Sequence, residues 1–446
     1  MTDKRDNPLP FFTKLGFGFG SLGTGIYSTV PGVLLLYYLT QVLDISPALA
    51  GFVVFIPKVW DVVTDPMMGY LSDRTISRFG RRRPYLLLGA VSMSVTFVFL
   101  FSVPESMTGD AVVFYILAVY ILSATAYTIY AVPYIAMPSE MSDQPTERTS
   151  LMSFRMAFAL LGILAGSSLA PYLVGYFGGG RDGYAAMSLV IGMVCALSML
   201  VPFVATKRSY SVGSVKASEP LAFRQSFSSV LSYTPFRWLL LVYVIQLTAM
   251  GIFSAMMPFL ISDVRSGQEA DLGEAFFILV GVSILTIPIW SNAAKTIEKK
   301  RLFFAAATLY GAGTVSLLWV GAGSYPVFAA ALAVIGAALS GIQLMPFAML
   351  TDVIRAYGDR KNQALEGAFT GIWTSTEKIG LALGPLIAGF GLQIVSTDTS
   401  SPTVFELLLL TGFLPGIIIL LSAFVVRGYP LEEAVGSARY QEPAHD

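Results

Sequence analysis

Apolar stretches long enough to cross a membrane recur along the whole chain. Each holds about 20 predominantly apolar residues, the length that a helix needs to span about 30 Å of hydrocarbon. Only 13% of the 446 residues are charged, whereas a soluble domain typically has about 25%. The chain is therefore predicted to be an all-α membrane protein embedded in a lipid bilayer, and not a soluble globular protein.

Twelve predicted spans divide into two groups of six. Their approximate limits are 15–40, 48–72, 84–104, 110–137, 150–175, 184–206, 236–261, 274–293, 302–321, 325–352, 366–394 and 403–427. The longest polar interval, 207–235, separates the groups. We therefore expect an N-terminal six-helix bundle over 1–206, a central loop over 207–235, and a C-terminal six-helix bundle with a polar tail over 236–446.

Lysine and arginine are distributed unevenly between the two sides of the predicted membrane. The loops on one side hold nearly all of them, and the other side has only Arg181 and Arg265. Because cytoplasmic loops carry the excess of basic residues, this side is predicted to be cytoplasmic, together with both termini and the central loop. The plasma membrane, a bacterial inner membrane, is the expected location.

A weak internal repeat supports the two halves. Spans four and ten are each followed by proline and an aromatic residue, then an acid, a basic loop and a span that opens near alanine and phenylalanine. Parallel six-helix repeats of this kind occur in transporters.

Several classes of function are excluded by composition. The formal net charge is zero, so no nucleic-acid partner is expected. The single cysteine, Cys195, and the single histidine, His445, provide no metal-ligand spacing and no histidine proton relay. No serine–histidine pair or phosphate-binding loop is present, so an intramembrane enzyme is disfavoured. A channel is also disfavoured, because two repeats fit rocking around a central site better than a symmetric pore.

The second span contains three ionisable residues on one helical face, Lys58, Asp61 and Asp65. Each charge costs at least about 2.5–3.5 kcal/mol at the centre of a span unless it is paired or hydrated. Two carboxylates about 6 Å apart repel by roughly 2–3 kcal/mol at an effective dielectric near 20. Lys58 can balance the charge of only one of them, so the pair is predicted to bind a proton or Na⁺. The alternative is a static salt-bridge network to a neighbouring helix.

A Na⁺ site also needs neutral oxygens, and Thr128 in the fourth span is a candidate. Threonines in spans often bond only to their own backbone, so this residue alone is a weak indication.

Two further cations lie inside spans, Arg155 in the fifth and Lys378 in the eleventh. They favour a polar or anionic solute. Trp373 and Thr374 lie near Lys378, and an aromatic face with polar groups suits a sugar ring. In the alternative interpretation, these residues pack and pair between helices.

The run from Lys58 to Gly89 resembles the signature of the glycoside–pentoside–hexuronide:cation symporters, the branch of the major facilitator superfamily typified by melibiose permease. The matching pieces are Trp60-Asp61, Asp65-Pro66, Gly69, Asp73-Arg74-Thr75, Gly80-Arg81 and Arg83-Pro84, with further matches at KLGFGFGSLG, TERTSLMSFR and TSTEKIGLALG. The resemblance covers the whole chain. It implies the major facilitator fold and cation-coupled symport by alternating access, with no cofactor besides the coupling ion, Na⁺ or H⁺.

The resemblance also implies roles for individual residues. The cation site maps onto Asp61 and Asp65, with Thr128 contributing, and these acids would hold the metal if the ion is Na⁺. The substrate cavity maps onto Tyr127, Arg155, Thr374 and Lys378, and the basic loop after the second span, with Asp73, Arg74, Arg81 and Arg83, maps onto a cytoplasmic gate. A monomer is expected.

Three departures bear on the solute. Gly25 and Ala131 replace two sugar-binding aspartates of melibiose permease, and Ile135 replaces a tryptophan. Melibiose is therefore not expected as the substrate, and a sugar-like solute that is anionic becomes more plausible on charge grounds. The second hypothesis is a carrier for a lysolipid or another amphiphile, because the segment around Ala131 resembles sodium-dependent lysophospholipid transporters.

Overall fold

The computed structural model describes residues 9–142, 144–207, 228–264, 269–361, 365–396 and 402–430. Within these ranges the chain forms helices and turns and no strand, which confirms the all-α class. Eleven of these helices are long and apolar enough to cross a membrane. The helix that begins at Phe11 and continues through π-helical turns to Val42 occupies the remaining predicted span.

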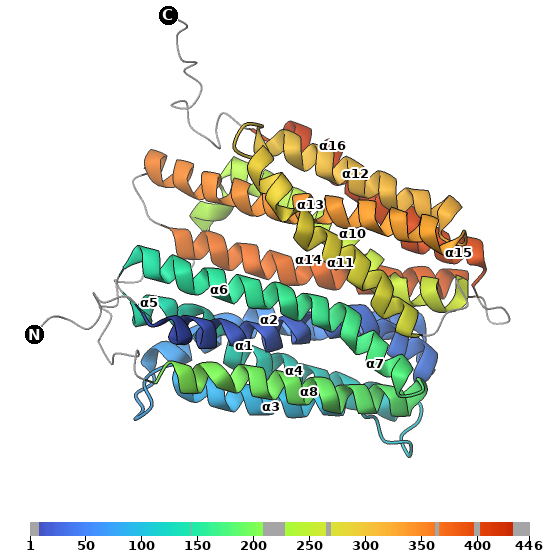
Figure 1. The fold of residues 1–446 in the computed structure, drawn as a ribbon, viewed down its shortest axis with the longest axis horizontal. Helices are drawn as coiled ribbons and strands as arrows, with labels where there is room; N and C mark the ends of the chain where they lie inside the picture. The colour runs from blue at the N-terminus through green and yellow to red at the C-terminus, as the bar shows by residue number, and fades with distance from the viewer. Residues whose placement is uncertain are drawn as a thin grey trace, which may run out of the picture. The chain divides into compact units, whose positions relative to one another are not determined.

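The described chain divides into two compact units. The first unit holds α1 (Phe11–Val30), α2 (Pro47–Arg74), α3 (Arg83–Phe101), α4 (Asp110–Ala136), α5 (Pro138–Met141), α6 (Pro145–Leu164), α7 (Ala170–Tyr176) and α8 (Gly180–Ala205). It also includes the beginning of α11 (Glu269–Ala293), as far as Phe277. Figure 1 shows α1 alongside α6, and α3 alongside α8.

The second unit contains the remainder of α11 and the helices that follow. These are α12 (Lys299–Val320), α13 (Tyr325–Lys361), α14 (Glu366–Val395), α15 (Val404–Leu408) and α16 (Leu414–Val425), and α10 (Thr234–Phe259) belongs to the same unit. α10 packs against α14 as its main partner, as α1 packs against α6 in the first unit.

Both units contain very close helix crossings at glycine. A Cβ atom on Gly162 in α6 would lie 2.4 Å from the carbonyl oxygen of Leu22 in α1, and one on Gly384 in α14 would lie 2.3 Å from the carbonyl carbon of Gly251 in α10. Real Cβ atoms essentially never approach other atoms so closely, so both crossings require residues without a side chain. Close approach at small residues is how helices associate where apolar surface alone gives no driving force.

The helices of both units present large apolar side chains on their surfaces. Phe114, Leu197 and Ile289 are 72%, 63% and 65% exposed, respectively. An exposed apolar surface of this extent is expected to face lipid rather than water.

Candidate functional site

The acidic face of α2 meets a threonine of α4 inside the first unit. Asp61 is fully buried and Asp65 is half-buried. The hydroxyl of Thr128 donates to Oδ1 of Asp65 at 2.7 Å, and the same oxygen lies 3.5 Å from Oδ1 of Asp61. A hydroxyl has a single proton but two acceptor lone pairs, so Thr128 bonds one acid and leaves acceptor capacity beside the other. The three residues predicted to form the cation site are thus brought together.

Lys58 lies on the same helix and is half-buried. Its ammonium group is 5.8 Å from the centroid of the Tyr120 ring on α4. A cation over an aromatic face is favoured electrostatically by the ring quadrupole. The charge-balancing role predicted for Lys58 stays a prediction.

α2 packs against α4. Tyr120, Ser123 and Tyr127 follow one another at helical spacing along one face of α4, and Thr128 lies on the neighbouring face. The ring of Tyr127 is stacked on that of Tyr27 from α1, with centroids 4.9 Å apart and planes inclined by 17°. Tyr127 therefore has one ring face occupied by packing.

Arg155, the other predicted substrate residue of this unit, lies on α6 and is half-buried. Its Nη1 atom lies 3.9 Å from the sulfur of Met156. A guanidinium keeps its charge inside a protein, so α6 carries a fixed cation at this point.

The remaining predicted substrate residues lie on α14 in the second unit. Trp373 is 1% exposed and its ring is stacked on that of Tyr243 from α10, at 3.8 Å and 13°. Thr374 is exposed, and its hydroxyl donates to the carbonyl of Thr370 at 3.0 Å. Lys378 is half-buried one turn further along α14. The contacts of Trp373 are those of a packing residue, and its role toward a solute stays a prediction.

Gly25 does not lie where a solute-binding side chain could replace it. A Cβ atom at this position would be 2.6 Å from the carbonyl oxygen of Ala159 in α6 and 3.1 Å from the Cα of Gly162. Close helix packing therefore leaves no room for an aspartate side chain at this position.

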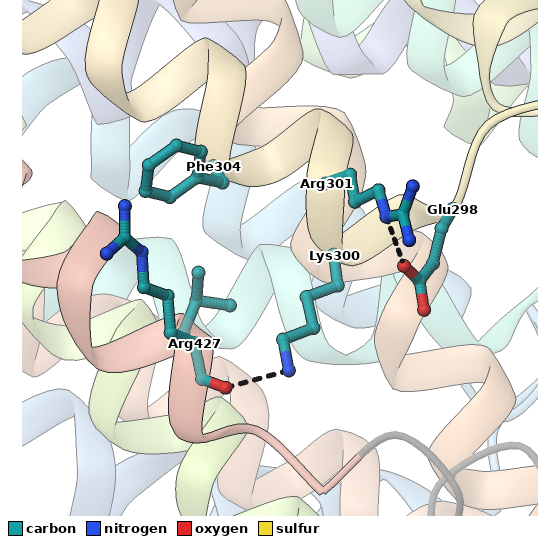
Figure 2. A pocket seen from close by; sticks show the side chains of 6 residues that line it. Glu298, Lys300, Arg301, Phe304 and Arg427 are labelled. Carbon is teal, nitrogen blue, oxygen red and sulfur yellow. Dashed lines mark hydrogen bonds and ion pairs between the residues drawn. The ribbon is translucent and has the colours of Figure 1, made fainter.

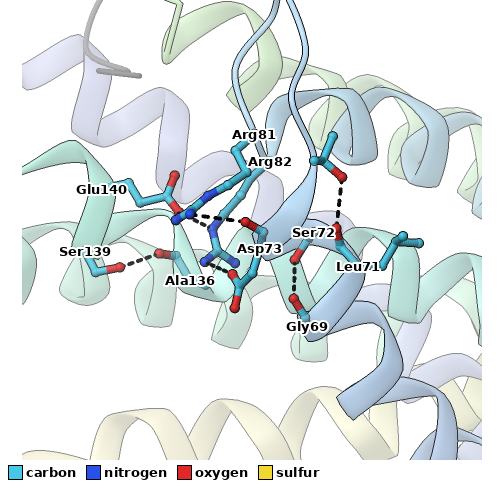
Figure 3. A network of polar contacts seen from close by, with 10 residues as sticks. Gly69, Leu71, Ser72, Asp73, Arg81, Arg82, Ala136, Ser139 and Glu140 are labelled. Atoms are coloured by element: carbon cyan, nitrogen blue, oxygen red, sulfur yellow. Dashed lines mark hydrogen bonds and ion pairs between the residues drawn. The ribbon is translucent and has the colours of Figure 1, made fainter. Parts of the chain in front are cut away.

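An ion-pair cluster lies at the junction of α2 and α3 (Figure 3). Arg82 binds Oδ1 of Asp73 at 2.6 Å and Oε1 of Glu140 at 2.5 Å. Arg81 binds the same oxygen of Glu140 at 2.5 Å. Glu140 belongs to the short helix α5, so the cluster ties the α2–α3 loop to the segment that follows α4. Gly80, with φ at +95°, allows the tight turn that brings the arginines back.

Two arginines predicted for the gate lie outside this ion-pair cluster. The guanidinium of Arg74 stacks on the ring of Tyr70 at 3.9 Å. Arg83 donates to the carbonyl of Phe203 at the end of α8, at 2.5 and 3.2 Å. Arg83 therefore holds the end of α8.

Arg82 and Glu140 were missed by the sequence interpretation. Arg82 stands between two residues of the signature, within a run of three arginines. Glu140 is the acid of the internal repeat in the first half, and its recurrence at the corresponding place in the second half could have marked it as a candidate residue. Its counterpart in the second half, Asp352 of α13, also pairs with a base, since it binds the ammonium of Lys299 at 2.6 Å.

A surface pocket of the second unit lies between α12 and the end of α16 (Figure 2). It is lined by Glu298, Lys300, Arg301, Phe304, Val426 and Arg427. Lys300 donates to the carbonyl of Arg427 at 2.8 Å, and Arg301 pairs with Glu298 at 3.0 Å. None of the predicted site residues lines this pocket. Among the described residues, no group of three or more histidine, cysteine, aspartate or glutamate side chains is placed to hold a metal ion.

Residues 16–433 match the family described as MFS/sugar transport protein. The chain belongs to this family. The match confirms the resemblance to the cation symporters of the major facilitator superfamily and, with the helical architecture, the predicted fold class.

Individual relatives of this MFS/sugar transport protein agree with the family match. The chain is 28% identical to the putative glycoside/cation symporter YagG of Escherichia coli (strain K12), with 87% of this chain and 84% of that protein covered. It is 23% identical to the sodium-dependent lysophosphatidylcholine symporter 1-A of Danio rerio, with 96% and 87% covered.

A solved structure shows the same fold. The crystal structure of the D-xylose-proton symporter superposes with a TM-score of 0.73 at 15% identity, covering 96% of this chain and 99% of that chain. The protein is thus a multi-pass membrane transporter, and the prediction that it is not an enzyme is confirmed by its family and fold.

Proposed function

We propose that this protein is a secondary active transporter that couples entry of a sugar-like solute to a cation, Na⁺ or H⁺, by alternating access of two six-helix bundles. The observation that carries the proposal is the contact of the Thr128 hydroxyl with the carboxylates of both Asp61 and Asp65. An acid pair that has one fully buried member and shares one neutral hydroxyl is suited to hold a small cation. Binding and release of that cation would change the electrostatic free energy of α2 in each cycle.

The solute is proposed to be sugar-like and anionic. YagG is named a glycoside/cation symporter, which supports a sugar-like solute. Arg155 and Lys378 supply cations, whereas the two sugar-binding aspartates of melibiose permease are absent. Tyr127, Trp373 and Thr374 are the further residues proposed to bind the solute.

The cluster of Asp73, Arg81, Arg82 and Glu140 is proposed to be part of the cytoplasmic gate. Its ion pairs join the α2–α3 loop to α5 and must rearrange if these segments separate. Charge-assisted bonds of this kind are stronger than neutral ones, so the cluster would bias the conformational equilibrium. We place it on the cytoplasmic side, with both termini, from the arrangement of basic residues. We further propose that the protein is a monomer and that it is located in a bacterial inner membrane.

Uptake into proteoliposomes tests the proposed coupling. Vesicles containing the purified protein would receive an inward Na⁺ gradient, an inward proton gradient or no gradient, with a panel of radiolabelled sugars and sugar acids outside. Saturable accumulation above the external concentration is expected with one of the gradients and not without it. Equal, non-saturating entry under all three conditions would contradict symport.

A second candidate function is transport of a lysolipid or another amphiphile. The Danio rerio relative is named a lysophosphatidylcholine symporter. Ala131 is apolar and Ile135, 48% exposed, stands where melibiose permease has a tryptophan. Thermal-shift screening in detergent against sugars, sugar acids and lysolipids separates the two functions. Stabilisation by lysolipids alone would favour the second.

A further inference from the structure

The surface pocket between α12 and the end of α16 contains none of the residues proposed to bind the cation or the solute. Its volume of about 520 Å³ lies within the range of ordinary ligand pockets, about 300–1,000 Å³. Among its described lining residues, Lys300, Arg301 and Arg427 are cations, and Glu298 is the single acid. This lining has an excess of positive charge and is suited to bind an anion.

Arg427 is the base of the pocket that is most available to an anion. Its side chain is exposed, and its guanidinium group lies over the ring of Phe304, 4.6 Å from the centroid. Among the residues that the structure describes, Arg427 forms no ion pair with an acid. The N–H donors of a stacked guanidinium lie in its plane, so they remain free to bind the oxygens of a phosphate.

Lys300 and Arg301 complete the basic lining at the start of α12. The ammonium of Lys300 donates to the carbonyls of Arg427 at 2.8 Å and Tyr429 at 3.0 Å. An ammonium group has three donors, so a third remains for an anion. Arg301 pairs with Glu298 through Nε at 3.0 Å, and its side chain is 80% exposed. Lys300 therefore both joins the two walls of the pocket and contributes charge to it.

The pocket lies at one end of two membrane spans. It is formed where the span of α12 begins and the span of α16 ends. Exposed apolar side chains lead toward it along α16, since Ile417, Leu421 and Phe424 follow at helical spacing and Arg427 comes three residues later. A lipid whose acyl chains lie along this apolar surface would have its headgroup at the pocket.

We propose that this pocket binds the phosphate of an anionic phospholipid headgroup, held by Arg427 and Lys300. Basic pockets between membrane-spanning helices are suited to anionic headgroups. A water-soluble phosphate ester offers the same chemistry, but the adjoining apolar surface favours a lipid. The site is separate from the acid pair of α2, so the inference does not rest on the proposed function.

Native mass spectrometry of the purified full-length protein in a neutral detergent tests the inference. The protein would be titrated with phosphatidylglycerol or with zwitterionic phosphatidylcholine, and phosphatidylglycerol should bind more tightly. Arg427→Gln should raise the apparent Kd for phosphatidylglycerol about fivefold, which corresponds to about 1 kcal/mol for one basic residue at an anionic membrane surface. Arg427→Lys keeps the charge and should raise this Kd less.

Two further variants separate the pocket from general surface charge. Lys295→Gln removes an exposed base of the same unit that lies outside the pocket and donates to Oδ1 of Asn292. It should leave the Kd for phosphatidylglycerol unchanged. Glu298→Gln removes the acid of the pocket and releases Arg301 from its ion pair. It should lower the Kd, a gain that a purely structural role of these residues does not predict.

Weaker binding in Arg427→Gln, unchanged binding in Lys295→Gln and tighter binding in Glu298→Gln together support the inference. An equal rise in Kd in Arg427→Gln and Lys295→Gln would show general attraction to a basic surface and overturn it. Equal affinity for the two lipids would also overturn it. Displacement of phosphatidylglycerol by glycerol phosphate at similar concentration would assign the pocket to a soluble phosphate ester and overturn the lipid assignment.

Discussion

The two halves of the chain carry ion pairs at corresponding places, but the pairs differ in composition. In the first half, Glu140 follows the fourth span and binds Arg81 and Arg82, which directly precede α3. In the second half, Asp352 near the end of the tenth span binds Lys299, the first residue of α12. The Glu140 side chain is 6% exposed and that of Asp352 is 23% exposed.

An acid–base contact thus occurs at corresponding positions in both halves, but its partners and its burial differ. Glu140 shares its charge with two guanidinium groups, and Asp73 joins the same cluster through Arg82. Asp352 faces one ammonium, which also donates to the carbonyl of Ala348 at 3.0 Å. We therefore expect the ion pairs to contribute much more to the stability of the first half than to that of the second.

The largest effect is expected for Glu140→Gln. It leaves two guanidinium groups facing a neutral amide in a buried position, and breaking a buried pair in this way costs on the order of 3 kcal/mol. The midpoint of thermal unfolding in detergent should fall clearly. Glu105→Gln, a change at an exposed acid before α4, is the control. An unchanged midpoint in Glu140→Gln would contradict the expected larger contribution of ion pairs to the stability of the first half.

The loss of stability on substitution should be more similar between the two close helix crossings than between the ion pairs, because both halves use glycine at the crossing. A methyl group at Gly162 or Gly384 would collide with backbone atoms of the partner helix. Gly162→Ala and Gly384→Ala should each lower the free energy of unfolding by about 1–3 kcal/mol, as overpacking does.

Gly371→Ala on α14 is the matched control for these variants, since no atom lies within 4 Å of its added Cβ. Denaturation in mixed micelles would compare all three. Tolerance of alanine at only one of the two crossings would show that the halves do not share this contact.

A smaller effect is expected for Asp352→Asn. The pair with Lys299 is partly exposed, so its loss should cost about 1 kcal/mol, near the upper end for exposed pairs. The thermal midpoint should fall less than in Glu140→Gln, and the difference between the two midpoints is the measurement that sharpens the comparison. An equal fall in both variants would contradict the divergence.

The smallest effect is expected for Asp73→Asn. The side chain of Asp73 is 57% exposed, and its bond to Arg82 is screened by solvent. Stability should change by roughly 0.5 kcal/mol or less. If Asp73 acts in the gate, the rate of solute exchange should change more than stability does. A stability loss as large as that of Glu140→Gln would assign Asp73 a structural role instead.

Much of the architecture could be predicted because the bilayer imposes a simple length rule. The spans, the all-α class and the acid pair of α2 follow from hydropathy and from the cost of charge in lipid. The proximity of Thr128 to both acids was anticipated only as a candidate, since a threonine in a span ordinarily bonds to its own helix.

Contacts between distant segments were harder to predict. Nothing near Tyr27 or Tyr127 in the sequence indicates that their rings stack, because they lie on different helices, 100 positions apart in the numbering. Arg82 could not be chosen over Arg81 or Arg83 from a run of identical residues. The role of Gly25 depended on the helix opposite, which no local pattern specifies.

The central claim, that Asp61 and Asp65 hold the coupling cation, is tested most directly by measuring accumulation and exchange in the same proteoliposomes. Asp65→Asn should abolish gradient-driven accumulation of a solute identified by the uptake panel, while equilibrium exchange of that solute continues. Undiminished accumulation by Asp65→Asn and by Asp61→Asn would contradict the account.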